Sequence, residues 1–176
     1  LSNLRESYEN SSLAELLPIT KASLDNRRLG ERLARLTARQ VELIESAVVK
    51  GVIEHEGIGL DALAFDCTNF DSYAAASTRS RLLKRGHGKS GRSLRVLGLG
   101  LLVTEDGGIP LLTLTYPGNE NDVTAFVRFL GGLQRRRASL PLPLDATIAA
   151  DGGNISKAIL QRLESDGKRQ LHYVIR

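Results

Sequence analysis

The sequence has only one cysteine, and it has no methionine and no tryptophan. Cys67 alone excludes an internal disulfide and a zinc site built from several cysteines. No apolar run reaches the length of a transmembrane helix, and the first residues lack the basic-then-apolar pattern of a signal peptide. These absences predict a cytoplasmic location and no membrane contact.

The ends of the sequence lead us to expect an internal fragment of a longer protein. The chain begins at Leu1 and stops at Arg176 inside an apolar, strand-like run. Its 176 residues are still enough for one domain with its own core. The net charge of +4 is mild, so the distribution of the charges is more informative than their total.

The N-terminal part has a helical pattern. Residues 1–22 give only weak helix signals, but Leu29, Leu33 and Leu36 recur at helical spacing. The sequence "TARQ" at 37–40 is a capping-box pattern that starts a further helix. Residues 24–50 therefore predict two helices or one kinked helix. We expect an N-terminal helical segment over 1–56 and a main domain over 57–176.

The main domain alternates between strand and helix patterns. The "EDGG" sequence at 105–108 predicts a hairpin, since an Asp-Gly pair suits a turn with positive φ angles. An amphipathic helix is predicted over 123–133, and "GGNIS" opens another after residue 151. Strands are expected at 60–66, 94–104, 108–116, 146–151 and 170–175. This order predicts an α/β fold with a five-stranded mixed sheet and helices on its faces.

Two of the predicted strands end on an aspartate, at "LAFDCT" (Asp66) and "TIAADGGN" (Asp151). Ligand sites in open α/β sheets gather beyond the carboxyl ends of strands, so the two carboxylates are candidates for one site. Paired carboxylates provide the hard oxygen ligands that Mg²⁺ prefers. The alternative is that each aspartate is a turn or helix-cap residue, because desolvating a carboxylate requires a partner. The pattern alone leaves both interpretations open.

A long basic connection follows the first predicted strand. No acidic residue occurs between Asp71 and Glu105, while arginine and lysine are frequent. Positive charge in a Gly- and Ser-rich connection is typical of a segment that binds a nucleic-acid backbone. A solvated surface loop is the alternative. The candidate DNA-binding residues here are Lys84, Arg85, Lys89 and Arg92.

Taken in order, four segments resemble the catalytic core of the DDE transposases of bacterial insertion sequences, in the group marked by a downstream Tyr-Arg-Glu-Lys signature. These segments are "FDCTNF", "KRGHGKSGR", "LGLGLLVTEDGGIPLLTLTYPGNENDVTAF" and "ADGGNIS". The resemblance runs from about residue 60 to residue 176. It implies an RNase H-like fold whose first three strands are antiparallel.

The resemblance also implies a function. It makes DNA the partner, as transposon ends and target, with Mg²⁺ or Mn²⁺ as cofactor and two ions in the intact enzyme. Asp66 and Asp151 match the first two acidic ligands, which places their carboxylates roughly 4–7 Å apart as a two-metal site requires. Asn119, in the turn of "YPGNEND", is expected near DNA. The intact protein would act at the bacterial nucleoid, with homo-oligomers on DNA possible.

The third acidic ligand of that family lies after the fifth strand, so no residue of this chain is assigned to it. The fragment is therefore expected to be inactive alone. Two other functions remain open: another RNase H-like nuclease such as a resolvase, and a non-catalytic DNA-binding remnant. The second would bind DNA in a salt-dependent way without needing either aspartate.

Overall fold

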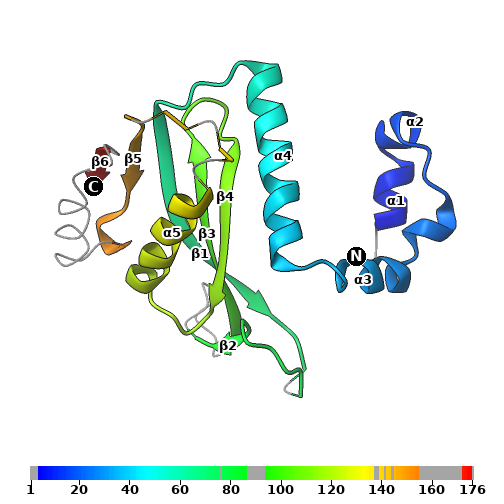
Figure 1. The fold of residues 1–176 in the computed structure, drawn as a ribbon. Coiled ribbons are helices and arrows are strands. Elements are labelled where there is room, and N and C mark those ends of the chain that lie inside the picture. Colours follow the sequence, from blue (N-terminus) through cyan, green and yellow to red (C-terminus); the bar gives the residue numbers. More distant parts are fainter. Residues whose placement is uncertain are drawn as a thin grey trace. The chain divides into compact units, whose positions relative to one another are not determined.

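The computed structural model describes residues 4–75, 77–86, 94–136, 139–140, 142–143, 145–154 and 172–175. The chain divides into two compact units, Leu1–Ile44 and Glu45–Arg176 (Figure 1). None of the helices in the described ranges is long and apolar enough to cross a membrane.

The first unit is helical. It contains α1 (Leu4–Glu9), α2 (Leu13–Leu16), a 3₁₀ turn η1 (Lys21–Leu24) and α3 (Asn26–Leu33). The Asp25 carboxylate caps α3 by accepting the backbone N–H groups of residues 27 and 28. Helix α4 (Ala38–Glu56) begins at the predicted capping box, where Thr37 and Gln40 bond each other's backbone N–H groups. The structure thus has two helices over residues 24–50, and α4 continues to residue 56.

The second unit is built on a mixed six-stranded sheet, one strand more than the five expected. Strands β1, β3 and β4 are antiparallel neighbours, while β5 and β6 run parallel to β1 in the order β3-β1-β5-β6. The short β2 pairs with the start of β3. Their bounds are β1 (Ala62–Ser72), β2 (Lys84–Arg85), β3 (Arg95–Thr104), β4 (Pro110–Pro117), β5 (Thr147–Ala150) and β6 (His172–Ile175).

Helix α5 (Asp122–Arg136) packs its apolar side on one face of this sheet (Figure 1). Phe65 of β1 stacks on Phe129 with ring centroids 4.1 Å apart and also contacts Phe126. All three rings are buried. Val49 and Ile53 of α4 join the same core. The amphipathic pattern of residues 123–133 is therefore explained by burial against the sheet.

Two expectations about the elements need correction. β1 does not end at Asp66 but continues to Ser72, because residues 66–72 pair with residues 95–101 of β3. The basic connection also contains a strand, β2, that its sequence does not predict. The helix predicted after Asp151 falls mainly outside the described residues, which show only a 3₁₀ turn over Gly152–Asn154.

Candidate active site

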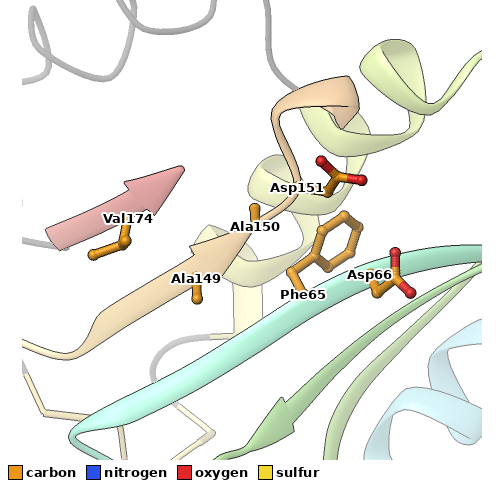
Figure 2. Close-up of a pocket in the computed structure, with 6 residues that line it drawn as sticks. All are labelled: Phe65, Asp66, Ala149, Ala150, Asp151 and Val174. Carbon is orange, nitrogen blue, oxygen red and sulfur yellow. The ribbon is translucent and has the colours of Figure 1, made fainter. Parts of the chain in front are cut away.

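Asp66 and Asp151 come from neighbouring parallel strands. The last paired residues of β1 and β5 are Phe65 and Ala150, and each aspartate is the next residue along its chain. Paired positions on adjacent strands lie about 4.8 Å apart, so both carboxylates start from closely spaced backbone. Both aspartates are exposed and border one open pocket of about 660 Å³ (Figure 2).

The rest of this pocket is apolar. It is bordered by Phe65, Ala149, Ala150 and Val174, all labelled with the two aspartates in Figure 2. Because side chains alternate along a strand, Asp66 faces away from the core that holds Phe65. Its exposure on that face explains how a carboxylate is tolerated in the middle of a strand.

Each carboxylate is oriented by one backbone N–H group. The N–H of Cys67 donates to Oδ1 of Asp66 at 2.7 Å, and the N–H of Gly153 donates to Oδ1 of Asp151 at 3.4 Å. Neither Oδ2 atom accepts a hydrogen bond from the described residues. If the two aspartates are turn or cap residues, that role explains the hydrogen bond to Oδ1 of each carboxylate.

The expected DNA-binding residues do not gather around the two aspartates. Lys84 and Arg85 form β2, at the end of the sheet where β1 stops. Asn119 is exposed and follows Gly118, whose N–H donates to the carbonyl of Leu82 just before β2. Asn119 thus lies beside the β2 region. Two further expected residues, Lys89 and Arg92, lie outside the described residues.

Residues 61–176 match the family described as "Transposase DDE domain". The chain belongs to this family. Among curated proteins, no relative matches the chain.

Solved structures similar to this transposase domain include three Mos1 transposase complexes. The paired-end complex with the left transposon end is 14% identical, covers 99% of this chain and 57% of its own, and has a TM-score of 0.37. The mariner paired-end complexes with Mg and Mn are 16% and 13% identical, with TM-scores of 0.41 and 0.39. They cover 93% and 98% of this chain and 56% of their own. This chain therefore spans little more than half of each.

The transposase domain has a second cluster of ionisable groups next to Asp66, formed by Cys67, Tyr116 and Asp122. The hydroxyl of buried Tyr116 donates to Oδ1 of Asp122 at 3.0 Å. Burial raises the pKa of the Cys67 thiol to about 11; a hydrogen bond with Tyr116 lowers it, and the charges of Asp122 and Asp66 add smaller increases. A thiol with this pKa is protonated at neutral pH, which favours the interpretation of Cys67 as a packing residue.

The sequence pattern around Tyr116 does not single it out, although its partner strand carries a signal. Gly98 is paired with Tyr116, and a Cβ atom at Gly98 would lie 2.2 Å from the Tyr116 ring. Such a contact is far inside van der Waals distance, so the ring requires glycine there. A glycine within a regular apolar strand often marks close approach of a neighbour.

Proposed function

We propose that this chain is part of the catalytic core of a DNA transposase that cuts transposon ends and joins the freed 3′-hydroxyl to target DNA. Asp66 and Asp151 are its metal ligands. The observation that carries the proposal is their position beside one pocket, at the end of the paired part of β1 and β5, in a chain of the transposase DDE domain family.

The donor set fits divalent cations. Both groups are carboxylates, and each has an oxygen without a hydrogen bond from the described residues. Hard oxygen donors suit Mg²⁺ and Mn²⁺, which in two-metal sites stabilise the attacking and leaving oxygens of an in-line displacement. The N–H groups of Cys67 and Gly153 fix the carboxylates, and the apolar wall of Phe65 and Val174 borders the site.

The described residues contain no cluster of three His, Cys, Asp or Glu side chains able to hold a metal ion. Two carboxylates supply only part of the ligand set that the resemblance implies. We therefore expect residues 1–176 alone to bind metal weakly and to cut DNA poorly. The substrate in this proposal is DNA, bound in the intact protein by an oligomer.

Metal-dependent stabilisation tests the proposal. Melting is followed by far-UV circular dichroism with and without Mn²⁺ for the wild type and for an Asp66→Asn, Asp151→Asn double variant. Mn²⁺ at about 100 times its Kd stabilises a binding protein by about 2.7 kcal/mol, which raises the Tm of a chain this size by about 5–10 °C. We expect this rise in the wild type and none in the double variant.

Asp145→Asn is the matched control, because Asp145 is an exposed aspartate outside the pocket. Equal stabilisation of wild type and double variant by Mn²⁺ would show that the metal site is wrong. DNA binding that depends on salt but on neither aspartate or metal would instead favour a non-catalytic remnant. In the intact protein, joining of a 3′-hydroxyl to target DNA separates a transposase from a nuclease that only hydrolyses.

A further inference from the structure

A second pocket, of about 470 Å³, opens at the end of the sheet where β1 stops. One wall is the end of β1 and the residues that follow it, Ser72, Tyr73 and Ala74. The other is β2 and the start of β3, with Lys84, Arg85 and Arg95. The pocket therefore combines an aromatic ring with three cationic side chains.

Aromatic surface is exposed at this end of β1. Tyr73 is 83% exposed and Phe70, three residues earlier, is 53% exposed. By contrast, Phe65 and Tyr116, which belong to the hydrophobic core of the same unit, are buried. Exposed rings beside cations are the arrangement with which proteins stack unpaired bases and hold the adjoining phosphates.

Arg95 holds the backbone just after Tyr73. Nη1 of Arg95 donates to the carbonyl oxygens of Ala75 at 3.1 Å and Thr78 at 2.8 Å. A guanidinium has five N–H donors, so these two bonds leave the Nε and Nη2 donors of Arg95 for a ligand. Arg95 thus fixes the backbone that follows Tyr73 and borders the pocket itself.

The two cations of β2 are available for binding. Lys84 and Arg85 are exposed, and neither forms an ion pair with the residues that the structure describes. The sequence has no acidic residue between Asp71 and Glu105 to neutralise them locally. Their charge is therefore directed at solvent or at an anionic ligand.

The register connects this pocket to the aspartate pair. Ser72 is paired with Arg95, and Arg95 with Arg85, so these side chains share one face of the sheet. Lys84, the neighbouring residue of β2, alternates to the other face and borders the same pocket at the end of the sheet. Asp66 lies on the same face as Ser72, because it is six residues before Ser72 and side chains alternate. Six residues of strand span roughly 20 Å. A DNA strand with a rise of about 3.4 Å per nucleotide covers that distance in about six nucleotides.

We propose that this second pocket binds one unpaired base of a DNA strand, stacked on Tyr73, with its phosphates held by Lys84 and Arg85. The base lies about six nucleotides from the phosphodiester bound at Asp66 and Asp151. This inference rests on the proposed function for its choice of ligand. It adds recognition of an unpaired nucleotide at a site separate from the metal ligands.

Binding of single strands with and without bases tests the proposal. Fluorescence anisotropy is measured with residues 1–176, in EDTA, using a fluorescein-labelled twelve-nucleotide oligothymidine and an abasic strand of equal length. Stacking contributes enough per base for alanine substitution to weaken binding by on the order of tenfold. We expect the wild type to prefer the base-bearing strand by about this factor, Tyr73→Ala to lose the preference, and Tyr73→Phe to retain it.

The role of the charged residues is tested by the salt dependence of binding. Lys84→Ala with Arg85→Ala lowers the slope of log K against log salt by about 1.4, at about 0.7 per contact for single strands. Tyr73→Ala leaves that slope unchanged. Lys50→Ala, an exposed lysine on α4, is the control for net charge and changes the slope by less than one contact.

Equal binding of base-bearing and abasic strands by the wild type would overturn the proposal, as would loss of the preference in Tyr73→Phe. Neither result affects the Mn²⁺-dependent stabilisation that tests the proposed function. Because Tyr73 is largely exposed, its variants should melt at the wild-type temperature, and circular dichroism checks this.

Discussion

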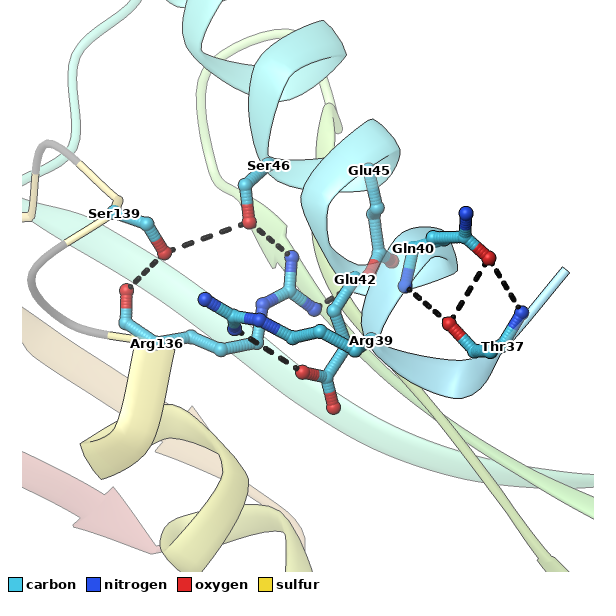
Figure 3. Close-up of polar contacts among 8 residues, drawn as sticks. All are labelled: Thr37, Arg39, Gln40, Glu42, Glu45, Ser46, Arg136 and Ser139. Carbon is cyan, nitrogen blue, oxygen red and sulfur yellow. Dashed lines mark hydrogen bonds and ion pairs between the residues drawn. The ribbon is translucent and has the colours of Figure 1, made fainter.

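Replacing Glu45 by glutamine removes the negative charge from a polar network that joins α4 to α5 and to the edge of the sheet. Nη1 of Arg136 donates to Oε2 of Glu45 at 2.5 Å, and Nη2 donates to Oγ of Ser46 at 3.0 Å (Figure 3). The other Glu45 oxygen accepts the backbone N–H of Thr113, on β4, at 3.0 Å. One carboxylate thus neutralises a buried arginine and satisfies a strand N–H.

The expected loss of stability follows from burial. The Arg136 side chain is 5% exposed and that of Glu45 is 25% exposed. Removing one member of a buried ion pair costs about 3–5 kcal/mol, because the other charge is left uncompensated. Glutamine keeps an acceptor oxygen and Glu45 is partly solvated, so we expect Glu45→Gln to cost about 2 kcal/mol. For a chain of this size that corresponds to a fall in Tm of about 4–8 °C.

Urea unfolding followed by far-UV circular dichroism is the appropriate assay, since the chain has no tryptophan. Glu54→Gln is the control: Glu54 pairs with Lys50 on the exposed side of α4, and we expect a cost below about 0.5 kcal/mol. Arg136→Met combined with Glu45→Gln should cost less than the sum of the single changes, by about 1–2 kcal/mol. Equal small costs for Glu45→Gln and Glu54→Gln would refute the reasoning.

Two further predictions concern the residues behind Asp66. Gly98→Ala places a methyl group against the buried Tyr116 ring and should lower stability by about 1–3 kcal/mol, measured by the same urea titration; an unchanged midpoint would contradict the close approach of the ring. The raised pKa of Cys67 means that its contribution to stability is intact below pH 9 and is lost between pH 9 and about 11, as the unfolded thiol ionises first. Urea midpoints across this range should therefore fall less for Cys67→Ala than for the wild type, and parallel curves would show that the thiol is not responsible.

Much of the sheet was predictable from the sequence because its strands carry local signals. β3 alternates between buried and half-buried residues along its whole length, as its apolar run predicts. The "EDGG" hairpin forms as expected, although the positive φ angles fall on Gly107 and Gly108 and not on the aspartate. β2 was not predictable: its two residues, Lys84 and Arg85, carry no apolar pattern, and it forms only by pairing with β3.

The sequence argument for pairing Asp66 with Asp151 assumed that both residues end their strands, and for Asp66 this is wrong. The sequence suggested that Asp66 stands at the tip of a strand, whereas β1 continues past it as the antiparallel partner of β3. What ends there is the neighbouring strand β5, whose last residue pairs with Phe65. β1 therefore loses its parallel neighbour at Asp66, and the chain after β5 turns away at Asp151. Removal of that neighbour opens the pocket beside both carboxylates. Apolar periodicity identifies each strand separately, but it carries no information about where a partner strand stops, and that end point determines where the pocket opens.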